Sequence, residues 1–175
     1  PEPLESLMNF TVNVFKNAAG RKLSSIEAHD VVCKIAEVVV VGGVRRSALI
    51  SLSNLSDDRM RAAKSGQWWN DNPQRALANN SAAYAEKPDI GVFMDEWKSL
   101  YDSKSGERGI FNRESAVWMA SKNGRRNTED YEFGTNPCSE IILRNREFCN
   151  LSEVVVRASD TCLLYTSPSP RDTMS

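Results

Sequence analysis

The stretch SALISLSNL, residues 47–55, decides the fold class that this sequence predicts. Apart from Leu49, its apolar and polar residues alternate, and a period of two is typical of a β-strand. Helical patterns lie on both sides of it. The preceding helix opens with Ser24 and Glu27 at capping-box spacing, and Ser56 is placed to cap the following one. A strand between two helices is the repeating unit of an α/β domain.

Predicted helices and strands alternate along the rest of the chain. The pattern predicts helices at residues 4–18, 24–38, 56–66, 89–102 and 113–122, strands at 47–55, 81–85 and 109–111, and a loop at 67–80. The helix at 89–102 has the clearest periodicity, and we expect it to bury its apolar face, formed by Phe93, Met94, Trp97 and Tyr101. The order of elements predicts an α/β fold with a mostly parallel sheet.

Composition excludes several classes of protein. The chain has 41% hydrophobic and 26% charged residues and a net charge of -1, so we expect neither nucleic acid nor a membrane as a partner. No apolar run approaches the roughly 20 residues needed to cross a bilayer, and no signal peptide is present. We therefore expect a cytoplasmic location. The sequence begins with Pro1 and not with Met, which suggests a piece of a longer protein.

The four cysteines and the single histidine, His29, do not favour a metal site, because they form no C-x-x-C pair. Without a secretory signal the thiols are expected to be reduced, and we interpret Cys33 as a small buried apolar residue. From about Ser159 the chain becomes rich in Ser, Thr and Pro. The run CLLYTSPSPRD resembles translated sequencing-linker read-through, so we expect residues 161–175 to be non-native and disordered, and residues 1–160 to form the domain.

A concentration of reactive side chains lies in NPCSEIILRNREFCNL, residues 136–151. In an extended strand Asn136, Cys138 and Glu140 would point to one face, with neighbours about 6.6 Å apart at about 3.3 Å per residue. A strand with only a packing role would carry apolar residues on one of its faces. Cys149 follows Cys138 by eleven positions. Packing alone does not explain the alternation of an amide, a thiol and a carboxylate.

Three segments in order resemble the catalytic subunit of ribonucleotide reductases, most closely the adenosylcobalamin-dependent (class II) enzymes. They are VVVVGGVRRSALISLSNL (38–55), SGERGIFNRESA (105–116) and NPCSEIILRNREFCNLSEV (136–154). The resemblance covers residues 1 to about 160. It implies part of the ten-stranded α/β barrel of that family, with a finger loop that carries the radical cysteine.

The resemblance also implies a role for each reactive residue. Cys138 would become a thiyl radical and remove the 3′ hydrogen of the ribose, Glu140 would act as base on the 3′ hydroxyl, and Asn136 would bind the substrate and orient the carboxylate. Cys149 would be one of two thiols that supply electrons and end as a disulfide. The partner cysteine, the rest of the barrel and the C-terminal thiols are not in this sequence, so we expect it to be inactive alone.

The segment VGGVRRSA, residues 41–48, has two interpretations. Its spacing alone favours a helix C-cap followed by a solvated basic turn. The resemblance instead implies a flexible loop that passes information from an effector site to the substrate base, formed by Gly42, Gly43, Arg45, Arg46 and Ser47. We assign no catalytic role to the segment GERGIFNRE.

The partners implied by the resemblance are a ribonucleotide substrate, a dNTP or ATP allosteric effector and a reductant of the thioredoxin or glutaredoxin type. Adenosylcobalamin would be bound mainly by other parts of the enzyme. Two alternatives remain open: a class I-type reductase that uses a separate metal radical subunit, and a nucleotide-binding remnant without chemistry. The sequence does not distinguish a diphosphate from a triphosphate substrate.

Overall fold

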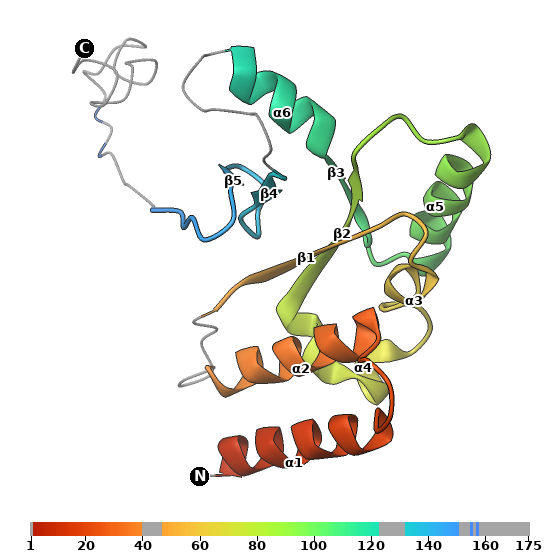
Figure 1. Cartoon of the computed structure of the whole chain (residues 1–175), viewed down its shortest axis with the longest axis vertical. Coiled ribbons are helices and arrows are strands. Elements are labelled where there is room, and N and C mark those ends of the chain that lie inside the picture. The colour runs from red at the N-terminus through yellow and green to blue at the C-terminus, as the bar shows by residue number, and fades with distance from the viewer. Residues whose placement is uncertain (1, 40–46, 123–131, 151–154, 156, 158–175) are drawn as a thin grey trace.

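The computed structural model of the chain describes residues 2–39, 47–122, 132–150, 155 and 157 (Figure 1). Its helices are α1 (Glu2–Asn17), α2 (Ser25–Val38), α3 (Asp58–Arg61), α4 (Trp68–Asp71), α5 (Ile90–Ser103) and α6 (Arg113–Lys122), with a 3-10 helix, η1 (Pro73–Leu77). Its strands are β1 (Leu49–Ser53), β2 (Ala78–Tyr84), β3 (Gly109–Asn112), β4 (Gly134–Thr135) and β5 (Ile142–Leu143).

The centre of the fold is a parallel sheet in the order β1-β2-β3. The chain passes from β1 to β2 through α3, α4 and η1, and from β2 to β3 through α5. The predicted α/β class with a parallel sheet is confirmed. The predicted loop at 67–80 is wrong, because it contains two short helices and the start of β2. Asn79 and Asn80 pair with Ile50 and Ser51 through their backbones, which need no apolar side chains.

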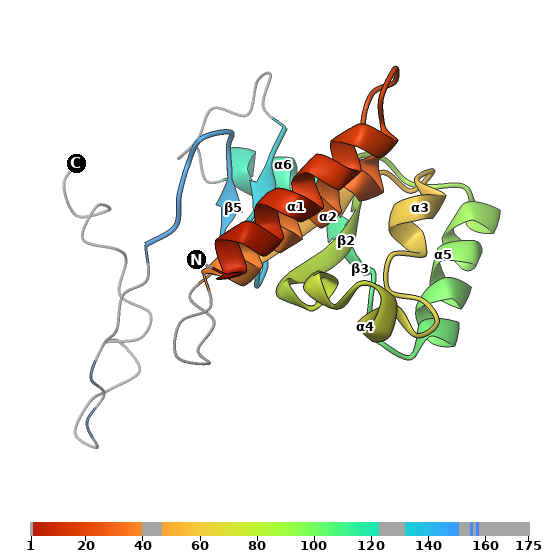
Figure 2. The same ribbon diagram turned by 90° about the horizontal axis from the view of Figure 1, so that it is seen from below.

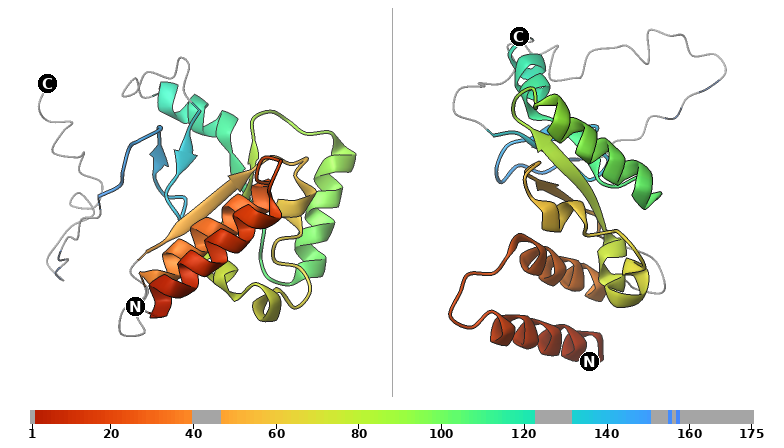
Figure 3. Two further views of the ribbon diagram at one scale, coloured as in Figure 1. Left: turned by 60° about the horizontal axis from the view of Figure 1, so that its bottom comes forward. Right: turned by 90° about the vertical axis from the view of Figure 1, so that its right-hand side faces the viewer.

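The two faces of β2 support different layers (Figure 1 and Figure 3). Ala83 lies on one face, in a core cluster with Phe111, Ala116, Ala120 and Phe133. Leu52, Val117 and Ile142 pack against that cluster, so α6 and the β4–β5 hairpin cover this face. Ser53 points to the opposite face from Leu52, and it binds Arg108, which holds Glu96 of α5. The sheet therefore separates the hairpin from α5.

The starts of α2 and α5 follow the capping rules. Ser24 and Glu27 form the predicted capping box, and Asp89 caps α5 by accepting from the Gly91 amide at 2.8 Å. The helix predicted at 56–66 is wrong in extent, since α3 ends at Arg61 and its cap is Asp57. Beyond it the chain turns so that the Lys64 ammonium is buried and donates to the Ala78 carbonyl at 2.5 Å.

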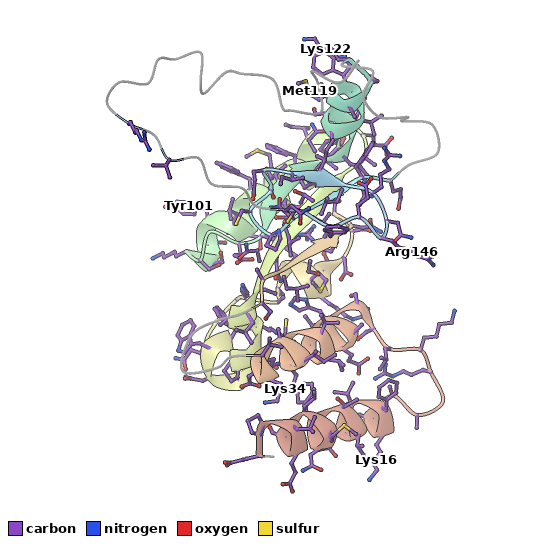
Figure 4. All side chains as sticks on the ribbon, turned by 90° about the vertical axis from the view of Figure 1, so that its left-hand side faces the viewer. Lys16, Lys34, Tyr101, Met119, Lys122 and Arg146 are labelled. Atoms are coloured by element: carbon purple, nitrogen blue, oxygen red, sulfur yellow. The ribbon has the colours of Figure 1, made fainter. Side chains whose placement is uncertain are left out.

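The predicted buried face of α5 is wrong. Met94, Trp97 and Tyr101 are 52%, 53% and 78% exposed, and Figure 4 shows Tyr101 pointing away from the body. Phe93 is half-buried and stacks on Trp97 with ring centroids 6.5 Å apart. The residue of α5 that is buried is Glu96, at 3% exposure. Apolar periodicity was misleading because an ionic contact decides which side of α5 faces the protein.

Glu96 is the centre of an ion cluster, Arg61–Glu96–Arg108. Arg108 donates to both carboxylate oxygens, at 2.6 and 2.8 Å, and Arg61 donates to Oε2 at 2.9 Å. Arg108 also binds Ser53 Oγ at 2.8 Å and the Asn54 carbonyl at 3.0 Å. Burial alone would raise the pKa of Glu96, but the arginine hydrogen bonds outweigh it and lower the pKa. The cluster joins α5, β3 and the end of β1.

The neighbouring Glu107 makes a second connection. Its Oε1 accepts from Lys64 Nζ at 2.8 Å, and its Oε2 accepts from the Asn80 backbone amide at 2.5 Å. Glu107 and Arg108 both belong to the segment GERGIFNRE, which resembled the reductases without an evident role. In this structure its Glu-Arg pair anchors β3 to the rest of the fold.

The N-terminal helices form a layer at one end of the molecule, with α1 lying along α2 (Figure 2). Arg75 of η1 attaches α2 through two 2.6 Å bonds to Asp30. Cys33 is fully buried, as predicted. Within the described part of the chain, no helix has both the length and the apolar content to cross a membrane.

Candidate functional site

The residues between β4 and β5 form a tight turn and not the extended row that the alternation predicted. The Asn136 amide donates to the Ile141 carbonyl at 3.1 Å, and the Ser139 amide donates to the Asn136 carbonyl at 3.0 Å. The second bond closes a β-turn with Pro137 at its second position, where a fixed φ is favoured. Ser139 has a φ of 65°. The Asn-Pro pair was the local signal for this turn.

Asn136 organises the turn with its side chain as well as its backbone. Its Oδ1 accepts from the Ile141 amide at 3.1 Å, and its Nδ2 donates to Glu140 Oε1 at 2.5 Å. Asn136 is 5% exposed, so these bonds are shielded from water. A buried amide therefore holds one oxygen of an exposed carboxylate.

Cys138 lies at the tip of the turn, between Asn136 and Glu140. Its side chain is exposed, and its thiol is free. Glu140 is exposed as well. The turn thus presents a thiol and a carboxylate to whatever approaches from outside, while the amide that orients the carboxylate stays beneath them. Such a pair can exchange a hydrogen atom and a proton with one substrate.

The turn is attached to the sheet at two places. At its base, Phe133 is fully buried in the core cluster, and its carbonyl accepts from Arg113 Nε at 2.9 Å. At its tip, Asn79 Nδ2 of β2 donates to the Pro137 carbonyl at 2.8 Å. The sequence prediction missed Asn79, because residues 67–80 read as a loop and no local pattern connects two residues 58 positions apart.

Cys149 lies beyond β5, after a turn in which the Arg144 amide donates to Glu147 Oε2 at 2.8 Å. Its side chain is half-buried, and its thiol is free. The structure therefore places Cys149 outside the turn that holds Cys138, without a disulfide between the two.

The predicted substrate and effector loop lies mostly outside the described residues. This applies to Gly42, Gly43, Arg45 and Arg46, and also to the predicted tail at 161–175. Ser47 is described: it is half-buried, and its hydroxyl donates to the Ala36 carbonyl at 3.4 Å, at the end of α2.

His29 does not contribute to the turn. It is 6% exposed, its Nε2 lies 3.5 Å from Cys33 Sγ, and burial lowers its pKa. It lines a cleft of about 430 Å³ between α2 and β1, together with Ser51 and Asp57. Cys138 is not among the residues that line this cleft.

Comparison with known proteins identifies relatives among the ribonucleotide reductases. The chain is 36% identical over 160 residues to an adenosylcobalamin-dependent ribonucleoside-triphosphate reductase of Lacticaseibacillus paracasei. It is 35% and 34% identical to reductases of the same name from Lactobacillus gasseri and Lactobacillus leichmannii. The alignments cover 88% of this chain but 20% of each relative. No protein-family model and no solved structure matches.

Proposed function

We propose that this chain, which belongs by sequence to the family of adenosylcobalamin-dependent ribonucleoside-triphosphate reductases, carries the radical loop of such an enzyme. The observation that carries the proposal is the turn itself: an exposed thiol lies two residues from a carboxylate that a buried amide holds. In this proposal the parallel strands belong to the ten-stranded barrel, and the turn is its finger loop. The substrate is a ribonucleoside triphosphate, as in the names of the relatives.

Each residue of the turn has one task. Cys138, as a thiyl radical, removes the 3′ hydrogen of the ribose, and its exposure allows the contact. Glu140 accepts the proton of the 3′ hydroxyl, which requires hydrogen-bond reach of the same sugar. Asn136 occupies Oε1 of that carboxylate, so we assign Oε2 to the substrate. The amide bond keeps the carboxylate in one orientation before the substrate arrives.

The reaction also needs two electrons, because a hydroxyl leaves the ribose as water and hydrogen replaces it. Cys149 supplies one of two thiols, which become a disulfide, and the resemblance places its partner upstream of this sequence. A thioredoxin or glutaredoxin-type reductant restores the thiols in the cytoplasm. The loop of Gly42, Gly43, Arg45, Arg46 and Ser47 relays the identity of a bound dNTP or ATP effector to the substrate base.

Adenosylcobalamin, when bound, supplies the radical equivalent that this chemistry requires. The described residues fit a chain that meets the cofactor without holding most of it. Cys138 is exposed at the tip of the turn, whereas His29, the single histidine, is buried against Cys33. We therefore assign Cys138 to the cofactor side of the site and place the main binding residues in other parts of the enzyme.

The names of the relatives favour cobalamin over the class I-type alternative, in which a separate metal subunit forms the radical. The alternative of a remnant without chemistry is weakened by the turn, because all of its reactive groups are present and ordered around Asn136.

The test compares Cys138→Ser with Cys149→Ser in the full-length reductase. We expect Cys138→Ser to abolish the substrate-dependent change in the cobalamin spectrum and all deoxynucleotide product. Cys149→Ser should keep the spectral change but divert the substrate to decomposition with release of free base. Stopped-flow spectroscopy and chromatography measure the two outcomes. Turnover by Cys138→Ser, or identical behaviour of both variants, would contradict the assignment.

A further inference from the structure

We infer that Asn79 is a positioning residue for Cys138, which it holds by a hydrogen bond from β2 to the peptide group that carries the thiol. This inference rests on the proposed function, because position matters only if Cys138 reacts. Asn79 lies outside the three segments that make up the family resemblance.

The contact reaches the turn immediately before the reactive residue. Asn79 Nδ2 donates to the Pro137 carbonyl at 2.8 Å. That carbonyl and the backbone nitrogen of Cys138 belong to one peptide group, which is planar. A hydrogen bond to this oxygen therefore restricts the orientation of the peptide group that precedes the Cys138 side chain.

The bonds within the turn cannot do this by themselves. The bonds of Asn136 to Ile141 and from Ser139 to Asn136 fix the shape of the turn, but both partners of each bond move with it. A contact with another element is needed to fix the turn relative to the sheet. Asn79 belongs to the central strand of that sheet.

Two contacts with β2 prevent the turn from pivoting. At the base, Phe133 packs in the cluster that contains Ala83. At the tip, Asn79 binds Pro137. Asn79 and Ala83 are four residues apart on one strand, which corresponds to about 13 Å at about 3.3 Å per residue. Because the two attachments are this far apart, loss of the outer one frees the tip while the base stays packed.

The bond can be removed without dismantling the sheet. Asn79 is exposed, and its pairing with Ile50 of β1 uses the backbone. Asparagine is also a poor strand former, so replacing it does not remove a favourable propensity. The side chain of Asn79 is therefore available for a task other than stability.

The expected consequence is a loss of rate. Removal of a hydrogen atom requires the reacting atoms in near contact, and a displacement of about 1 Å can cost about 10²-fold. Asn79→Ala should lower kcat by about 10- to 100-fold and leave KM for the nucleotide unchanged. Asn79→Asp keeps the shape but removes the donor and sets a carboxylate against the Pro137 carbonyl, so it should be at least as slow.

The kinetics are measured in the full-length reductase, with Asn70→Ala as the matched control. Asn70 is another exposed asparagine, and its side-chain amide donates to a near neighbour, Gln67 Oε1, at 3.2 Å. The control should keep the kcat, KM and melting temperature of the unmodified enzyme. A rise in KM at unchanged kcat for Asn79→Ala would indicate a substrate contact and overturn the inference.

A second readout does not depend on catalysis. Alkylation of Cys138 by iodoacetamide is followed by peptide mass spectrometry, with Cys149 in the same molecule as the reference. Asn79→Ala should speed alkylation of Cys138 about fivefold, the factor equivalent to about 1 kcal/mol for one hydrogen bond, and leave Cys149 unchanged. An unchanged Cys138 rate, or equal changes at both cysteines, overturns the inference. If the unmodified enzyme makes no deoxynucleotide, the proposed function fails and the alkylation result still decides the position of Cys138.

Discussion

The turn Asn136–Glu140 and the ion cluster Arg61–Glu96–Arg108 are both networks of polar side chains, but they differ in reach and burial. Bonds within the turn and to Ile141 join residues three to five positions apart. Within the cluster, Glu96 accepts from Arg108 and Arg61, which lie 12 and 35 positions away. Cys138 and Glu140 are exposed, whereas Glu96 and Arg108 are 3% and 2% exposed. In the proposed function the exposed polar groups of the turn take part in chemistry, whereas the buried groups of the cluster hold elements of the fold together.

The largest expected effect on stability is at Glu96. Glu96→Gln should lower the free energy of unfolding by about 3–5 kcal/mol, because Arg108 would stay buried without its opposite charge. Urea denaturation of the full-length protein measures the loss. The activity of the fraction that remains folded should be unchanged, since the cluster lies on the opposite face of the sheet from the turn.

Asp102→Ala is the control for that experiment. Asp102 pairs with Lys98 on the exposed surface of α5, where such pairs contribute about 0.3–0.5 kcal/mol. Equal losses for Glu96→Gln and Asp102→Ala would show that burial does not distinguish the two pairs.

Protonation at low pH should remove the negative charge of Glu96 without a substitution. The pKa of Glu96 is lower in the folded chain than in the unfolded one, because the arginine bonds outweigh burial. Its contribution to stability is therefore complete above the unfolded pKa of about 4.3 and is lost as the pH falls through the folded pKa. Urea midpoints between pH 6 and acid should fall less steeply for Glu96→Gln than for the unmodified protein. Parallel pH profiles would contradict this role of Glu96.

A smaller loss of stability than at Glu96 is expected in the turn. Asn136→Ala removes two side-chain hydrogen bonds but keeps the backbone ones, so it should cost about 1–3 kcal/mol. Deoxynucleotide formation should nevertheless be lost, because Glu140 is no longer oriented. Chemical denaturation and product analysis are compared with those of Asn145→Ala, an exposed position after β5. Full activity of Asn136→Ala would show that the reaction does not need the Asn136 side chain.

The errors of the sequence prediction have physical causes. Alternation of Asn136, Cys138 and Glu140 suggested a strand, but Pro137 and the Asn136 side chain stabilise a turn instead. Periodicity on α5 suggested an apolar contact, but pairing of Glu96 with two arginines decided its orientation. The sequence contains the residues of both networks but does not show which of them form hydrogen bonds with each other.

Local information determined a large part of this protein. The alternation of elements, the capping box at Ser24 and the identity of Asn136, Cys138 and Glu140 as a group all follow from residues close together in the chain. Only the tertiary structure decided that Glu96 is the buried residue of α5 and that Asn79 reaches Pro137. The reason is distance along the chain: helix caps and turns are specified within a few residues, whereas contacts between residues 35 or 58 positions apart form only after the strands have brought them together.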